Sequence, residues 1–243
     1  MKLSAPLRLS APLYRLKRQA RQLSRRDGIP LHAALDRTAA AEGFRSWSLL
    51  AARHADRSPA ARLYPRLSPG DLVLVAARPG QGKTLLSLEL AAQAMRAGHR
   101  GIYFSLEDTE REVPARFAAF GADPARFGDR FAFDGDDGIC ADHVAVRLAD
   151  CPPGTLAVID YLQLLDQRRD TPPLADQMRR LRALAAEREA VLVFVSQIDR
   201  RYDPAAKPLP DLGDVRRPNP LDLRLFTKTC FLQGGKVHFA AAG

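Results

Sequence analysis

The 243-residue sequence predicts an α/β fold, in which helices flank a central, mostly parallel β-sheet, preceded by a short basic helical segment. Strand-like and helix-like segments alternate along residues 61–243, as they do in βαβ units. A hydrophobic content of 46% is enough for a sizeable core. Residues 1–60 hold twelve Lys and Arg against four Asp and Glu, so they carry eight of the nine net positive charges. We therefore divide the chain into a basic helical segment with a linker, residues 1–60, and an α/β domain, residues 61–243.

The N-terminal segment is expected to form short helices over residues 13–55. Leu13, Leu16 and Ala20 recur on one helical face, with basic residues around the rest. Pro30 is suited to open a second helix, and Ser46 to cap a third. The excess of positive charge favours a polyanion as partner, because each neutralised phosphate releases counterions. The alternative is a basic face that only keeps the segment solvated.

In the α/β domain, short apolar runs predict buried strands, and apolar residues at helical spacing predict the helices between them. The expected strands are 71–76, 102–105, 131–133, 156–160 and 191–196. The expected helices are 83–97, 109–120 and 175–189. The Pro-rich stretch 198–220 is interpreted as a long loop, and 221–239 as one or two further strands.

Two absences in the sequence narrow the class of protein. No apolar run reaches the roughly 18 residues of a membrane helix, so we expect no membrane contact. Cys140, Cys151 and Cys230 are too far apart for metal-ligand spacing, which predicts reduced thiols in a cytoplasmic protein.

The most specific motif nearly fits the phosphate-binding pattern G-x-x-x-x-G-K-S/T, with alanine in the first glycine position. Its residues are Ala77, Arg78, Pro79, Gly80, Gln81, Gly82, Lys83 and Thr84. Gly80 and Gly82 let backbone N–H groups approach phosphates, and Lys83 is expected to reach the β- and γ-phosphates. The Thr84 hydroxyl is the expected Mg²⁺ ligand. Because a predicted strand precedes this turn and a helix follows it, the motif predicts a bound nucleoside triphosphate with Mg²⁺.

Three polar residues follow predicted strands and are candidates for the same site. Asp160 ends a buried strand, where a carboxylate faces the phosphate crevice and is suited to hold Mg²⁺. If the strand before Glu107 neighbours the phosphate-loop strand, Glu107 is a candidate general base. The residues alone leave open that Glu107 is a solvated acid at a helix start. They also leave open whether Gln197 senses the γ-phosphate.

Together, these motifs resemble the RecA-like ATPase core of the DnaB-type replicative helicases. Segment 68–84, SPGDLVLVAARPGQGKT, is similar to the family's phosphate loop, including its alanine. Segment 104–107 resembles the strand that ends in the family's catalytic glutamate, and 159–164 resembles its Walker B segment. Ser196-Gln197 is similar to its γ-phosphate sensor. The resemblance spans about residues 66–239 and implies hydrolysis of ATP with Mg²⁺, with Lys83, Glu107, Asp160 and Gln197 as catalytic residues.

The resemblance also implies movement on single-stranded DNA by a homo-oligomer, of which a hexameric ring is one form. The loop after Gln197 would then face the DNA backbone through its basic side chains. These residues are Arg200, Arg201, Lys207, Arg216 and Arg217. A solvated basic loop is the alternative interpretation.

The sequence departs from the family pattern in two ways. A short basic segment stands where the family carries a larger helical N-terminal domain. The family's trans-acting Lys-x-Arg pair corresponds to Lys228 and Cys230, so the finger arginine has no counterpart there; Arg224 and Lys236 lie nearby. An arginine finger contributes about 10³–10⁵ in turnover.

Three hypotheses follow from these features. The leading one is a compact DnaB-type DNA helicase that hydrolyses ATP. The second is a RecA-fold, KaiC-like ATP-binding regulatory or accessory protein without unwinding activity. The third is a DNA-binding module in which the basic helices bind and the ATPase only regulates.

Overall fold

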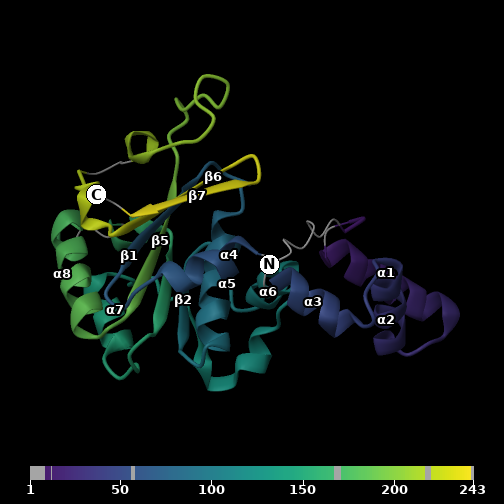
Figure 1. Cartoon of the computed structure of the whole chain (residues 1–243). Coiled ribbons are helices and arrows are strands. Elements are labelled where there is room, and N and C mark those ends of the chain that lie inside the picture. The colour runs from purple at the N-terminus through teal and green to yellow at the C-terminus, as the bar shows by residue number, and fades with distance from the viewer. Residues whose placement is uncertain (1–8, 12, 56–57, 167–170, 217–219, 242–243) are drawn as a thin grey trace, which may run out of the picture.

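The computed structural model describes residues 9–11, 13–55, 58–166, 171–216 and 220–241. Within this part of the chain, a seven-stranded sheet has the order β3-β2-β4-β5-β1-β6-β7 (Figure 1). Neighbouring strands run parallel except at the β6–β7 hairpin, which is antiparallel. The strands are β1 (Leu72–Ala77), β2 (Gly101–Ser105), β3 (Phe131–Asp134), β4 (Leu156–Asp160), β5 (Val191–Gln197), β6 (Lys228–Gln233) and β7 (Lys236–Ala241). The predicted α/β class and mostly parallel sheet are confirmed.

Helices cover both faces of the sheet. One face is covered by α7 (Ala141–Leu148) and α8 (Leu174–Glu187), and the other by α4 (Pro59–Leu63), α5 (Lys83–Arg96) and α6 (Val113–Ala119). Successive strand residues alternate between the faces, so Leu72 and Leu74 pack with the α8 cluster while Val73 and Val75 pack with the α5 cluster. Both clusters are apolar, which explains why the central strands have uninterrupted hydrophobic sequences.

The carboxyl ends of the central parallel strands form one edge, and this edge carries the predicted site residues. Ala77 at the end of β1 is level with Gln197 at the end of β5, and Ser105 on β2 is level with Asp160 on β4. The assignment of Glu107 as general base assumed that the strand before it neighbours the phosphate-loop strand. This assumption is wrong, because β4 and β5 separate β2 from β1. Glu107 nevertheless follows β2 at the same edge, since all these strands are parallel.

The N-terminal helices α1 (Leu13–Asp27), α2 (Leu31–Ala41) and α3 (Trp47–Ala55) extend to one side of the sheet (Figure 1). Leu13, Ala39 and Leu50 form a small apolar cluster of their own. Helix α1 contacts the rest of the chain at Gly121, where an added Cβ would lie 2.7 Å from a methyl carbon of Leu13. The predicted helices over residues 13–55 are therefore present, and α1 packs against the sheet domain.

The expected elements and the structure differ at three places. Residues 58–65, with their Ser-Pro and Tyr-Pro steps, are expected as a linker but contain α4, because the Ser58 side chain accepts a hydrogen bond from the Ala61 N–H and caps a helix that begins with proline. Helix α6 begins at Val113 instead of 109, after Glu112 accepts hydrogen bonds from the backbone and hydroxyl of Thr109. Helix α7 was not predicted. Across the described ranges, every helix is too short or too polar to cross a bilayer.

Candidate functional site

The phosphate-loop sequence forms a tight turn between β1 and α5. Gly80 and Gly82 have φ of 77° and 85°, a backbone conformation that side chains disfavour. Helix α5 begins at Lys83, directly after Gly82. The first N–H groups of α5, which lack partners within the helix, therefore point to the mouth of the turn, where the helix carries partial positive charge. The local geometry is that of an anion cradle.

Thr84 and Asp160, which come from different elements, meet beside this turn. The Thr84 hydroxyl donates a hydrogen bond of 2.6 Å to Oδ2 of Asp160. Asp160 is only 1% exposed. Its pKa is raised to about 6, mainly by burial and in smaller part by the carboxylates of Glu107 and Asp108, while Thr84 and Lys83 oppose the shift. The charge of Asp160 is therefore costly without a cation.

These two side chains fit a magnesium ion. Oδ1 of Asp160 is buried, and no hydrogen-bond partner for it occurs among the described residues. An unpartnered carboxylate oxygen beside a hydroxyl is the hard oxygen donor set that Mg²⁺ prefers, with phosphates and water completing the shell. A divalent cation would also offset the cost of burying the charge of Asp160.

A buried network that the sequence did not predict supports Asp160 from the other side. The Tyr103 hydroxyl donates a hydrogen bond of 2.8 Å to Asp108 and lies 3.5 Å from Oδ2 of Asp160. Arg116 holds both oxygens of Asp108, with a shortest distance of 2.7 Å. Burial and the charge of Asp160 hold the pKa of Tyr103 well above its ordinary value, so its hydroxyl stays a donor. In the sequence Asp108 is one of several acids near Glu107, and its eight-residue spacing from Arg116 matches no recognisable motif.

Glu107 and Gln197 line one small cavity at the carboxyl edge of the sheet. Its volume is about 240 Å³, and its other walls are Tyr161, Gln163 and Arg216. The Arg216 guanidinium donates to Oε1 of Gln197 at 3.3 Å, and the Arg216 N–H donates to the Gln197 carbonyl at 2.8 Å. The Glu107 carboxylate is exposed and makes no hydrogen bond to the described residues. The structure thus brings together an available carboxylate, an amide and a guanidinium.

The basic residues of the loop after β5 differ in their surroundings. The side chains of Arg200 and Arg201 are exposed. Lys207 forms ion pairs of 2.6 Å with Asp211 and Asp214, so its charge is already neutralised within the loop. Arg216 faces the Glu107 cavity, as described above, and Arg217 lies outside the described residues.

The positions expected to supply a trans-acting group differ in exposure: Arg224 and Lys236 are exposed, Lys228 is half-buried and Cys230 is buried. Cys230 is fully buried in the middle of β6, opposite Val75, and burial raises its pKa to about 12. Lys228 begins β6 level with Val73, at the sheet end opposite the phosphate loop. Arg224 is held by both oxygens of Asp222. The position that replaces the finger arginine therefore faces the core.

Comparison with known families decides the affiliation. The sequence profile of the AAA_25 family, described as an AAA domain, matches residues 38–205, which is more than half of the chain. The chain belongs to this AAA domain family. Within it, the resemblance to the DnaB-type, RecA-like core is confirmed by curated relatives and by solved structures.

Among the relatives of this AAA domain protein is the replicative DNA helicase DnaB of Leifsonia xyli subsp. xyli, 27% identical over 187 residues, or 64% of this chain and 41% of the relative. A probable plasmid replicative DNA helicase of Chlamydia trachomatis is 27% identical over 180 residues, or 62% and 40% of the two chains. The chain thus spans about two fifths of the length of these relatives. A solved DnaB-like replicative helicase, described with its interactions with primase, superposes with a TM-score of 0.57 at 18% identity, over 89% of this chain and 65% of that one.

Proposed function

We propose that this AAA domain protein hydrolyses ATP with Mg²⁺ and uses the hydrolysis to move on single-stranded DNA, as a DnaB-type helicase. The observation that carries the proposal is the Thr84–Asp160 pair beside the phosphate loop, with an unpartnered buried oxygen on Asp160. Glu107 and Gln197 lie at the same edge of the sheet and offer a carboxylate and an amide for hydrolysis.

Each residue has a distinct role in the proposal. Residues 77–84 and Lys83 bind the phosphates, while Thr84 and Asp160 hold Mg²⁺, which when bound neutralises charge on the β- and γ-phosphates. Glu107 orients a water and accepts its proton, because its carboxylate is exposed and unpaired with other described residues. Gln197 contacts the γ-phosphate, with Arg216 holding its amide oxygen.

The nucleic-acid part of the proposal depends on the loop after β5. Arg200 and Arg201 are exposed, and their side chains form no ion pair with the described residues, so they are available to DNA phosphates. Lys207 is a weaker candidate because it is paired with Asp211 and Asp214. Tyr202 is buried and its hydroxyl donates to the Lys207 carbonyl, so it does not offer a stacking surface. We further propose a cytoplasmic homo-oligomer, hexameric by analogy with the family, with Lys228 still a candidate trans-acting group.

The buried Cys230 favours a second candidate function. A subunit without a finger arginine from its neighbour is expected to turn over slowly. A RecA-fold ATP-binding regulatory or accessory protein, without unwinding activity, would need no such group. The two candidates differ in how strongly DNA stimulates hydrolysis.

The test is ATP hydrolysis with and without a single-stranded oligonucleotide, together with strand displacement on a forked duplex. Lys83→Ala should abolish productive triphosphate binding. Glu107→Gln should retain ATP binding and lose about 10²–10⁴-fold in turnover, the usual contribution of a general base. Glu110→Gln is the matched control, since this carboxylate is also exposed but does not line the cavity of Glu107 and Gln197, and the variant should hydrolyse ATP normally.

Each outcome discriminates between the hypotheses. Unwinding and DNA-stimulated turnover, both lost in Lys83→Ala, support the motor. Slow hydrolysis that DNA leaves unchanged supports the regulatory ATPase instead. Wild-type turnover by Glu107→Gln would show that the base is another group.

A further inference from the structure

A large groove lies between the N-terminal helices and the sheet domain, away from the phosphate loop. Its volume is about 780 Å³, within the range of pockets that hold small organic ligands. Helices α1, α2 and α3 form one wall, and the end of α5 with the 3-10 turn η2 (Pro124–Arg130) forms the other. The close approach of Leu13 to Gly121 fixes α1 against the second wall. This contact joins the two walls at one point of the groove.

Positive charge dominates the lining of this groove. Lys17 and Arg21 come from α1, Arg96 from the end of α5, and Arg126 from η2. Across the residues that the structure describes, none of these four side chains has a hydrogen-bond or salt-bridge partner. Arg96 interacts electrostatically with Glu89, without a direct contact. Four available cations from two separate walls thus converge on one cavity.

The acidic residues of the groove are already engaged. Asp36 accepts a hydrogen bond of 2.8 Å from the Trp47 N–H, and Asp123 accepts one of 3.1 Å from the Ala125 N–H. The first bond ties α2 to the start of α3, the second caps η2, and neither carboxylate forms a salt bridge with one of the four cations. The net electrostatic character is that of a site for an anion.

Aromatic surface is present on both walls. Trp47 from α3 and Phe127 from η2 are partly exposed and line the groove. Phe127 is supported from behind by Phe117, with ring centroids 6.3 Å apart. Cations interleaved with aromatic rings are the combination by which proteins bind single-stranded nucleic acid, since the cations contact phosphates and the rings stack on bases.

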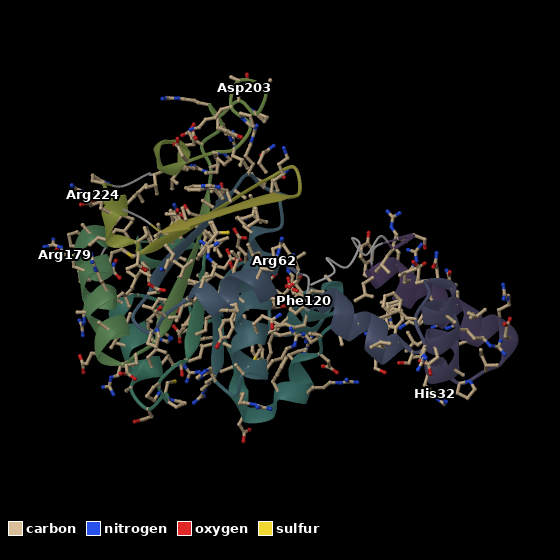
Figure 2. All side chains as sticks on the ribbon, viewed as in Figure 1. His32, Arg62, Phe120, Arg179, Asp203 and Arg224 are labelled. Carbon is tan, nitrogen blue, oxygen red and sulfur yellow. The ribbon has the colours of Figure 1, made fainter. Side chains whose placement is uncertain are left out.

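We propose that this groove is a second binding site for single-stranded nucleic acid. One or two nucleotides occupy it, with their phosphates on Lys17, Arg21, Arg96 and Arg126 and a base against Trp47. The site goes beyond the proposed ATPase function, because it uses no residue of the phosphate loop or of the loop after β5. Figure 2 shows the two regions apart, with His32 marking the N-terminal helices and Asp203 the tip of the β5 loop. The nucleic acid can occupy this groove without ATP bound at the phosphate loop.

The single tryptophan of the chain makes the test site-specific. Titrating the full chain with a short oligothymidylate, without ATP, should quench the fluorescence of Trp47. Lys17→Glu/Arg21→Glu should weaken the affinity roughly tenfold or more and flatten the salt dependence, since each lost phosphate contact removes about 0.7 from its slope. Trp47→Ala should weaken the binding of a labelled oligonucleotide about tenfold, as measured by anisotropy.

Matched controls separate this site from general electrostatics and from the ATPase. Arg18→Glu/Arg25→Glu makes the same change in net charge on the same helix, with exposed residues that do not line the groove, and should bind as the wild type does. Lys83→Ala should also keep the quenching, so a failure of the proposed ATPase function is distinguishable from a failure of this site. Thermal melting verifies that each variant is folded.

Three results would overturn the proposal. The first is an absence of quenching by the oligonucleotide. The second is equal weakening by the two charge-reversal pairs, which would mean that only net charge matters. The third is equally tight binding of polyphosphate or polyglutamate, which would identify the groove as a site for another polyanion.

Discussion

Replacing Asp160 by asparagine tests the electrostatics on which the magnesium assignment depends. Asp160 is buried, and its pKa is raised from 3.8 to about 6, mainly by burial. A carboxyl group with a raised pKa in the folded state binds its proton more tightly when folded than when unfolded. Stability from this group is therefore fully present below about pH 4 and is lost as the pH rises through about 6. Asparagine removes this dependence.

The magnitude follows from the shift. A rise of about two units corresponds to a penalty of about 3 kcal/mol once the group is fully charged, near pH 8. Near pH 5 the folded protein still keeps the proton, and about half of that penalty is present. Asparagine has other effects, such as a buried amide in place of the unpartnered Oδ1, but these are uncharged and cancel between the two pH values. The variant should therefore gain about 1.5 kcal/mol relative to the wild type between pH 5 and pH 8.

The assay is urea unfolding of both proteins near pH 5 and pH 8, with chelator and without nucleotide. Asp71→Asn is the control: Asp71 is also buried, but it accepts hydrogen bonds from Ser68 and Thr227, so its variant should lose stability. A stability difference for Asp160→Asn that is the same at both pH values, or that reverses sign, would refute the reasoning. Adding Mg²⁺ and ATP should then stabilise the wild type and leave Asp160→Asn unchanged, because ligand binding to the folded state raises stability.

Two further predictions concern groups outside the phosphate site. Cys230 is fully buried and its pKa is raised to about 12. In the native protein, Cys140 and Cys151 should therefore react with a thiol reagent, while Cys230 should react only in denaturant. Equal reaction rates of the three thiols in the native protein would contradict this. Gly121→Ala combines a φ of +80° with a Cβ 2.7 Å from Leu13, so it should cost about 1–3 kcal/mol more than Gly98→Ala, where a positive φ meets open space. Comparing their unfolding midpoints isolates the contact between α1 and the sheet domain, and equal midpoints would mean that α1 does not press on Gly121.

The strand, turn and helix around the phosphate-loop motif were predictable from the sequence because their requirements are local. A strand, a turn with two glycines at positive φ, and a helix that begins at Lys83 are consecutive in the chain, so spacing alone specifies them. Asp160 is distant in sequence, yet it ends a buried strand, and in a parallel sheet all such ends share one edge. The order of the strands within the sheet, in contrast, is not specified by local sequence. Nothing along the chain indicates that β4 and β5 separate β2 from β1. The assumption that the strand before Glu107 neighbours β1 was wrong for this reason.

Groups that act through tertiary contacts escape prediction for the same reason. Tyr103 occupies a strand position typical of a core residue, and only the folded structure places its hydroxyl between Asp108 and Asp160. Asp108 belongs to a run of acids that reads as solvated, until Arg116 reaches it from α6. Lys207 is the opposite case: its charge alone suggests a DNA contact, but its ion pairs with Asp211 and Asp214 make it a weaker candidate than Arg200 and Arg201.

The register of β6 explains why motif spacing could not locate a trans-acting group. Residue 230 lies in the middle of β6, opposite Val75, and packs in the apolar cluster beneath α5. An arginine there would bury an unpaired charge, which is costly, so cysteine at this position is a consequence of packing. A cation that assists a neighbouring subunit would come from an accessible position: Lys228 is half-buried, and Lys236 lies exposed on the β6–β7 hairpin, whose Gly234 N–H donates a hydrogen bond to Gln81 of the phosphate loop. The choice between motor and regulatory ATPase therefore depends on what that surface touches in an oligomer, and DNA-stimulated turnover measures this directly.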